Sequence, residues 1–177
     1  MLKSNFLSAI LLFLLALTTS ACQQKEQPKP QSQPVGQIQP QNDPKILQDI
    51  VQKDPNNLKV WIELGNVLMD TSRFNEAIDA YQKALSLDPT DVDVRVDMGT
   101  CYRNVGRSDI ALKEFRKAIE INPNHALAHR NMGVVLAADV RDNAQAVKEY
   151  EKYLQLAPNA VDADTIREDI LRLKAAK

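Results

Sequence analysis

The chain has 177 residues and nearly balanced charge, with 22 Lys and Arg against 23 Asp and Glu. Because non-specific nucleic-acid binding depends on a basic surface, this balance argues against that function. Of the two cysteines, only Cys101 lies in the part of the chain expected to fold, so no disulfide is expected within that part.

Residues 1–21 have the composition of a secretory signal peptide. A single charge at Lys3 is followed by an apolar run from Phe6 to Leu17, and then by small or polar residues up to Ala21. A helix of twelve residues covers about 18 Å, well short of the roughly 30 Å hydrocarbon core of a bilayer. A cleaved leader is therefore favoured over a permanent transmembrane helix.

Cys22 follows this leader directly, and Thr19-Ser20-Ala21-Cys22 resembles the bacterial lipoprotein box. In that family the cysteine is acylated and becomes the mature amino terminus, so the resemblance implies a membrane anchor through lipid on Cys22. The sequence departs from the family pattern at Thr19, where leucine is usual. Cleavage by the ordinary signal peptidase would also leave Cys22 first, but without lipid.

The residue after the cysteine, Gln23, resembles the outer-membrane sorting preference of Gram-negative bacteria. These features predict a lipid-anchored protein of the bacterial cell envelope, on the periplasmic face of the outer membrane. A secreted or soluble periplasmic protein is the alternative, and the choice between inner and outer membrane stays open.

Residues 22–42 are rich in Gln and Pro, with Val35 and Ile38 as the only sizeable apolar side chains. Such a segment cannot bury enough apolar surface to offset the entropy of ordering it. It is predicted to be a disordered tether, and polyproline II geometry would give it a reach of up to about 60 Å. A ligand for SH3-type domains is a less favoured interpretation, because no suitable proline spacing stands out.

A 34-residue repeat covers most of the remaining chain. Glycines fall in register at Gly65, Gly99 and Gly133, and an Asp-Pro or Asn-Pro pair ends each of the first two units. In the first unit the residues Trp61, Leu64, Gly65, Leu68, Ala77, Tyr81, Ala84 and Pro89 match the tetratricopeptide pattern. The second unit matches it with Met98, Gly99, Tyr102, Ala111, Phe115, Ala118 and Pro123, while Arg95 replaces the tryptophan.

Apolar periodicity supports the same interpretation, because each unit carries an apolar face with helical spacing in two successive segments, such as Ile78, Tyr81 and Leu85 in the second segment of the first unit. The proline that follows ends the second helix. Each unit is therefore expected to be an antiparallel helix pair. Gly65 and Ala77 lack bulk where the two helices approach, and Tyr81 fills the space between them.

The third unit carries one extra residue near Ala137 to Asp139 and has Tyr153 where a small residue belongs. The resemblance to the tetratricopeptide repeat (TPR) family implies an all-α helix-turn-helix solenoid, with repeats at about 58–91, 92–125 and 126–159. An N-terminal half-repeat helix within 43–53 precedes them, and a capping helix at about 162–175 closes them. The TPR domain would then span 43–177.

Members of the family bind partners on a concave face lined by the first helix of each repeat. Carried over to this chain, the positions that would line this groove are Lys59, Ile62, Asn66, Met69 and Asp70; Asp93, Val96, Thr100, Arg103 and Asn104; and Leu127, Arg130, Val134, Ala137 and Ala138. The set offers apolar spots and amide or guanidinium donors, which suits a peptide or helix.

Chaperone-binding members of the family hold a carboxyl terminus with a clamp of Lys, Asn, Asn, Lys and Arg. Here only Asn66 fits that clamp, because the other four positions carry Ile62, Asp97, Leu127 and Asn131. A dedicated clamp for cytosolic chaperones is therefore not expected.

No catalytic motif stands out: the chain has no phosphate-binding glycine loop, no GxSxG and no HExxH. His125 and His129 lie four residues apart, a spacing that suits a metal pair, but the ligands that would complete a site are missing and structural roles are favoured. Cys101 is expected to be a small packing residue. No metal, cofactor or catalytic residue is predicted.

The sequence thus predicts a non-catalytic protein-protein interaction module, an adaptor or scaffold that binds a protein or peptide segment in its groove. Self-association is a further possibility. The alternative is a periplasmic maturation or chaperone-like factor that holds client proteins such as apocytochrome or pilus subunits. An enzyme is the least favoured class, because the repeats take up nearly all the folded residues.

Overall fold

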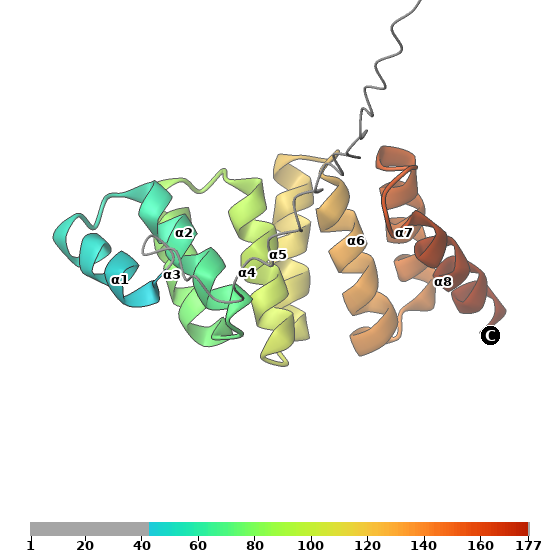
Figure 1. Cartoon of the computed structure of the whole chain (residues 1–177). Coiled ribbons are helices and arrows are strands. Elements are labelled where there is room, and N and C mark those ends of the chain that lie inside the picture. The colour runs from blue at the N-terminus through green and yellow to red at the C-terminus, as the bar shows by residue number, and fades with distance from the viewer. Residues whose placement is uncertain (1–42, 177) are drawn as a thin grey trace, which may run out of the picture. The chain divides into compact units, whose positions relative to one another are not determined.

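Figure 1 presents the computed structural model of the chain, which describes residues 43–176. The predicted signal peptide, the tether and the lipidation site at Cys22 lie outside these residues. Within them the all-α prediction is confirmed, because the described part of the chain forms eight α-helices and one π-helical turn and contains no strand. No helix in this range has the length and apolar content needed to cross a membrane.

The helices follow one another from one end of the domain to the other in chain order (Figure 1). α2 pairs with α3, α4 with α5, and α6 with α7, and each pair contacts the next. α1 packs on α2, and α8 packs on α7. Their bounds are α1 Pro44–Lys53, α2 Leu58–Asp70, α3 Phe74–Leu87, α4 Val92–Asn104, α5 Ser108–Ile121, α6 Ala126–Val135, η2 Leu136–Val140, α7 Asn143–Leu156 and α8 Ala163–Ala175.

The first helix of each pair begins at a side chain that accepts a hydrogen bond from the backbone. Asn57 accepts from the Val60 N–H, Asp91 from the Val94 N–H, and His125 Nδ1 from the Ala128 N–H at 3.2 Å. Such caps satisfy donors that have no partner within the helix. The same register position therefore starts all three pairs.

The turn inside each pair requires a left-handed backbone. Ser72, Gly106 and Arg141 have φ of 60°, 78° and 64°. The residue after each one donates its N–H back to the last turn of the preceding helix, as Arg107 does to Tyr102 at 2.8 Å. This is the geometry of a Schellman C-cap, in which glycine is unstrained and other residues are not.

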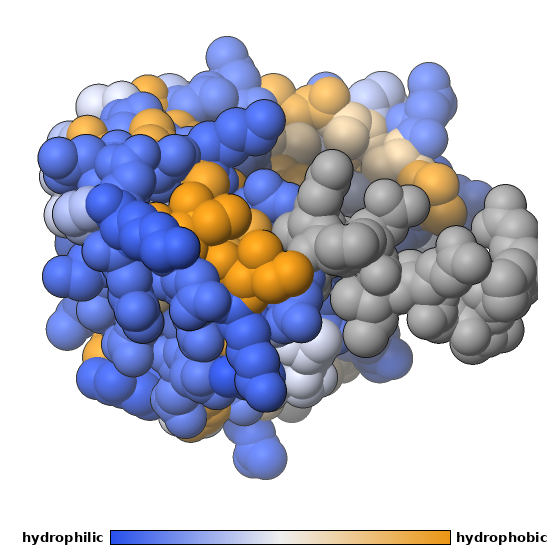
Figure 2. Space-filling model, turned by 60° about the vertical axis from the view of Figure 1, so that its left-hand side comes forward, coloured by the Kyte–Doolittle hydropathy of each residue, from blue (hydrophilic) through white to orange (hydrophobic). Residues whose placement is uncertain are grey.

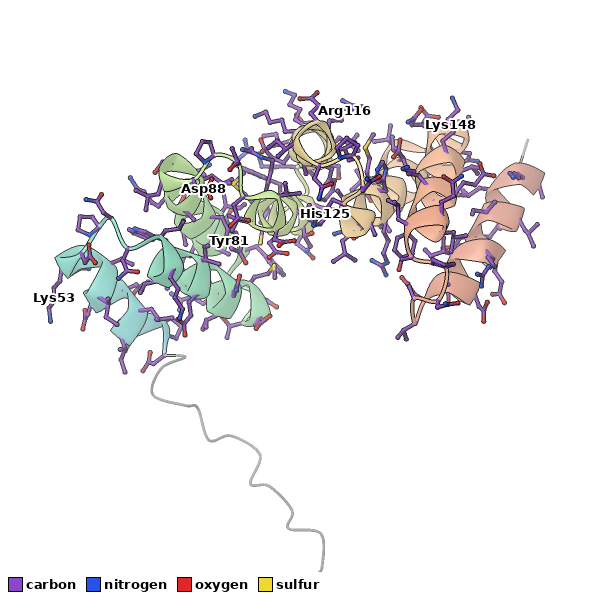
Figure 3. The ribbon with its side chains drawn as sticks, turned by 90° about the horizontal axis from the view of Figure 1, so that it is seen from above. Lys53, Tyr81, Asp88, Arg116, His125 and Lys148 are labelled. Atoms are coloured by element: carbon purple, nitrogen blue, oxygen red, sulfur yellow. The ribbon has the colours of Figure 1, made fainter. Side chains whose placement is uncertain are left out.

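A glycine facing an aromatic ring sets the approach of the two helices in every pair. A Cβ added at Gly65, Gly99 or Gly133 would lie 2.4 to 2.6 Å from the ring of Tyr81, Phe115 or Tyr150. Tyr81 and Phe115 have no exposed surface, and Tyr150 is 3% exposed. Figure 3 places Tyr81 inside the row of helices. The rings therefore occupy the space that a side chain on the facing helix would need.

The tryptophan position of the family pattern is filled in three different ways. In the first repeat the Trp61 indole donates to the Pro55 carbonyl at 2.9 Å. Arg95 takes this place in the second repeat, where it donates to the Pro89 carbonyl and pairs with Glu114, both at 2.7 Å.

In the third repeat His129 lies 3.0 Å from the Pro123 carbonyl through Nε2 and 2.7 Å from Glu149 through Nδ1. The first repeat carries Ala80 at the position that Glu114 and Glu149 occupy in the other two repeats. Each side chain at this position ties the start of its own repeat to the proline that ends the preceding unit.

The extra residue of the third repeat is accommodated by the π-helical turn Leu136–Val140, which extends α6. A π-turn holds one residue more than the α-helical turn that it replaces. Asp139 in this turn accepts hydrogen bonds from Arg103 Nε at 3.0 Å and from the Ser108 hydroxyl at 2.7 Å. The insertion therefore links the third repeat to the second.

We expect Gly99→Ala to lower the free energy of unfolding by about 2 kcal/mol, because the new methyl group would meet the buried Phe115 ring at 2.6 Å. This steric cost exceeds the gain in helix propensity. Urea denaturation followed by circular dichroism measures the change. Arg116→Ala, at an exposed position of α5, is the control and should shift stability by less than about 0.5 kcal/mol. A Gly99→Ala midpoint equal to the wild-type value would contradict this account of helix pairing.

Candidate functional site

The first helices of the three repeats form a continuous row, since α2 contacts α4 and α4 contacts α6. The predicted groove residues all lie on these helices or on the π-turn that continues α6. Most of them retain exposed surface, and Leu127 is 53% exposed. Val96 is the exception, because it is only 3% exposed. It belongs to the core and offers almost no contact surface to a partner.

An open hollow of about 660 Å³ lies along α2. Its lining includes three of the predicted residues, Lys59, Ile62 and Asn66, together with Leu58 and Glu63. The Asn66 side-chain carbonyl accepts a hydrogen bond from the Tyr81 hydroxyl at 2.8 Å, which fixes the orientation of the amide. This end of the row combines an apolar floor with polar groups at its edge.

A second hollow, of about 330 Å³, lies at the other end of the row. Val134, Ala137 and Ala138 of the predicted set line it. Sequence reasoning missed the contributions of α7 and α8, which add Tyr150, Asp169, Arg172 and Leu173. The sequence predicts the closing helix that α8 forms, but the groove positions of the family pattern end with the third repeat and do not extend to the side chains of α8.

The two arginines expected to act as free donors are engaged within the chain. Arg103 pairs with Asp139 of the π-turn, and Arg130 pairs with Asp162 at the start of α8. Asp162 also accepts from the Tyr153 hydroxyl. A partner would have to displace or share these carboxylates to use either guanidinium group, so Arg103 and Arg130 are not free donors in this structure.

The carboxylates of α2 and α4 have fewer positively charged neighbours than the two arginines have carboxylates. Burial raises the pKa of Asp97 to about 6, and the nearby Asp93, Asp91 and Asp70 add to this effect, which His125 partly offsets. Asp70 and Asp93 are exposed. The row therefore carries an excess of negative charge over its first two repeats.

The two histidines do not share a site, because each one uses its ring nitrogens separately. His125 caps α6 through Nδ1, and its Nε2 lies 2.8 Å from the Asp93 carboxylate. His129 is buried between Glu149 and the Pro123 carbonyl. Within residues 43–176 no group of three or more potential metal ligands converges.

Cys101 is fully buried in α4. Burial, together with the neighbouring Asp97, raises the pKa of this thiol to about 12. The thiol is therefore protonated near neutral pH, whereas a nucleophilic cysteine reacts as the thiolate.

Comparison with known proteins agrees with this geometry. A tetratricopeptide-repeat family model matches residues 58–91, and a second one matches residues 80–113. The chain carries tetratricopeptide repeats. The all-α solenoid predicted from the sequence is thus confirmed as a TPR fold. No curated protein matches the chain.

Two solved structures illustrate the similarity of fold. A crystal structure of MamA is 22% identical with a TM-score of 0.64, and the match covers 73% of this chain and 81% of that one. The first TPR domain of Spaghetti (RPAP3), bound to the HSP90 peptide SRMEEVD, is 25% identical with a TM-score of 0.64. That match covers 70% of this chain and 97% of the other.

Replacing Asp97 with Asn should change the pH dependence of stability. Because the folded-state pKa of Asp97 is raised from 3.8 to about 6, the folded form binds the proton more tightly than the unfolded form does. Wild-type stability should therefore fall as the pH rises from about 4 to about 6. Asp97→Asn removes this loss, so the variant should gain stability relative to wild type over that range and keep the gain at pH 7.

Thermal unfolding followed by circular dichroism at several pH values measures this difference. Asp79→Asn, at an exposed position of α3, is the control. Parallel pH profiles for wild type and Asp97→Asn would contradict the buried environment assigned to this carboxyl group.

Proposed function

We propose that this TPR domain is a non-catalytic adaptor or scaffold that holds a segment of a partner protein along α2, α4 and α6. The observation that carries the proposal is the row of partly exposed side chains with a hollow at each end. A row of this kind offers several separate contacts to an extended or helical segment, which is how peptide-binding grooves gain specificity.

The charge of the row favours a partner segment that carries basic side chains. Arg103 and Arg130 are neutralised by ion pairs with carboxylates. Asp70, Asp97 and Asp93, the last of which lies beside His125, leave negative charge on α2 and α4. The peptide in the RPAP3 complex, SRMEEVD, is acidic. We expect this chain to bind such a peptide poorly, since like charges across an interface are unfavourable.

The domain is further proposed to act in the bacterial envelope, tethered by residues 22–42 to a lipid on Cys22. The support comes from the sequence: the apolar leader, the lipoprotein-type box and the Gln and Pro-rich segment that follows it. Two or more acyl chains hold a protein stably at a membrane, whereas a single chain does not. A tether of this length would let the groove reach partners at a distance from the bilayer.

A maturation or chaperone-like role is the alternative. The apolar hollow at Leu58 and Ile62 would suit hydrophobic client segments. The two functions differ in their partners, because an adaptor binds a fixed partner in constant ratio, while a client holder captures several unfolded chains through apolar segments. Identification of crosslinked partners separates the two.

A photo-reactive residue at Asn66 of the full-length protein should crosslink a defined partner in intact cells. Asp70→Lys combined with Asp93→Lys should reduce this crosslinking at least about tenfold, because it reverses the charge of exposed carboxylates on α2 and α4. Asp79→Lys with Asp109→Lys makes the same charge change at exposed sites on the second helices and should leave capture unchanged. Equal capture by both double variants would rule out the groove as the binding surface.

Mass spectrometry of the mature amino-terminal peptide tests the anchor. We expect a chain that begins at Cys22 and carries acyl groups, and Cys22→Ser should release the protein from the membrane fraction. An unmodified Cys22 at the amino terminus would refute lipidation and leave the secreted or soluble periplasmic form.

A further inference from the structure

The terminal helices α8 and α1 expose different side chains at the two ends of the repeat array. At the carboxyl-terminal end, α8 buries Ala163, Ile166 and Ile170 against the array and exposes Arg167 and Glu168. A charged outer face of this kind is what a terminal unit needs in order to stay soluble. The outer surface of α8 also includes Leu171, which is 69% exposed, so one apolar side chain stands among these charges.

At the amino-terminal end, two apolar side chains are exposed on the same helix. α1 buries Leu47 and Val51 against the array, but Ile46 is 41% exposed and Ile50 is 38% exposed. Figure 2, which is turned toward this side of the domain, shows an apolar patch surrounded by hydrophilic residues.

The repeat register explains why these isoleucines are exposed. The residues 34 positions later, Ala80 and Ala84 of α3, are only 2% and 1% exposed. In the first repeat, α3 packs beside α2, the first helix of the same pair. α1 corresponds to the second helix of a pair, and the described residues contain no helix before it. The apolar face of α1 thus corresponds to a face that is covered in the complete repeats.

The face of α1 carries a self-complementary pattern. Asp43, Ile46, Ile50 and Lys53 are spaced by three, four and three residues, so they fall within an arc of about 80° on one side of the helix. The spacing is symmetric about its midpoint. When two copies of this helix lie antiparallel, each Ile46 opposes an Ile50 and each Asp43 opposes a Lys53.

The charged ends of this pattern are available for such contacts. Lys53 is exposed, and Figure 3 shows it at the end of the domain, directed away from the other helices. Asp43 caps α1 by accepting the Lys45 N–H on Oδ1, which leaves its second oxygen outside that bond. Opposite charges that flank an apolar centre set the direction in which two helices pair.

We propose that a second copy of this chain covers the exposed face of α1, forming a two-fold symmetric dimer in which the two α1 helices pack antiparallel. A two-fold interface uses the same surface patch on both subunits, so this patch must complement itself, as the Asp43, Ile46, Ile50 and Lys53 pattern does. The dimer does not depend on the proposed groove function, and either proposal can fail without the other.

The size of the interface predicts its strength. A helix of ten residues is about 15 Å long, so the contact is smaller than the roughly 1,200 Å² found in stable complexes. A weak, concentration-dependent dimer is expected. Sedimentation equilibrium of the full-length chain in density-matched detergent, over a series of protein concentrations, is the suitable measurement.

Ile46→Glu combined with Ile50→Glu should raise the dimer dissociation constant at least about tenfold, because four charges would then meet at the centre of the contact. Leu171→Glu, on α8, is the matched control, since Leu171 is an apolar side chain that is 69% exposed at the opposite end of the array. It should leave dimerisation unchanged. A wild-type chain that stays monomeric at every concentration would overturn the proposal and leave this face to a helix of another protein. Dimerisation of the Ile46→Glu, Ile50→Glu variant at wild-type strength would also overturn it.

Charge reversal tests the antiparallel arrangement. Asp43→Lys alone and Lys53→Glu alone should each weaken self-association, because like charges then face each other. An equal mixture of the two variants should recover a dimer, since the introduced lysine of one chain then faces the introduced glutamate of the other, and the native Lys53 of the first faces the native Asp43 of the second. Circular dichroism checks that α1 stays helical after loss of the Asp43 cap. A mixture that stays monomeric while its helices are intact would refute the antiparallel pairing.

Discussion

The contact between a glycine and an aromatic ring in each repeat is the constraint on which the rest of this fold depends. Gly65, Gly99 and Gly133 leave no room for a Cβ beside the facing ring. The ring in turn fills the space between the two helices, so the pair closes in one geometry only. Because all three pairs close in the same way, their first helices are brought side by side, and the row formed by α2, α4 and α6 follows from this repetition.

Stacking of the repeats depends on a second contact that recurs in every repeat, although a different type of side chain makes it each time. Trp61, Arg95 and His129 each meet the carbonyl of the proline six residues earlier. The tryptophan donates from its indole N–H, the arginine also pairs with Glu114, and the histidine also lies 2.7 Å from Glu149. Breaking the buried Arg95–Glu114 pair would leave an uncompensated charge, so these two residues have to change together.

The sequence predicts the repeated part of this architecture well, since the glycines recur every 34 residues, the rings and prolines do so up to the extra residue of the third repeat, and each position can be read against its equivalents. It predicts the surface of the groove less well. Val96 matches exposed positions by register, yet the neighbouring helices cover it. Arg103 and Arg130 look like free donors because their partners, Asp139 and Asp162, lie in the insertion and at the start of the cap, outside the repeat register.

The departures from the repeat therefore determine the charge of the groove. Without the extra residue in the third repeat, an α-helical turn would replace the π-turn and Asp139 would not take its present position. Without the cap, Asp162 would not be held beside Arg130. Each of these elements neutralises one arginine of the row, while the carboxylates of α2 and α4 remain. The proposed preference for a basic partner thus rests less on the repeats themselves than on the two places where the array departs from the repeat, the π-turn and α8.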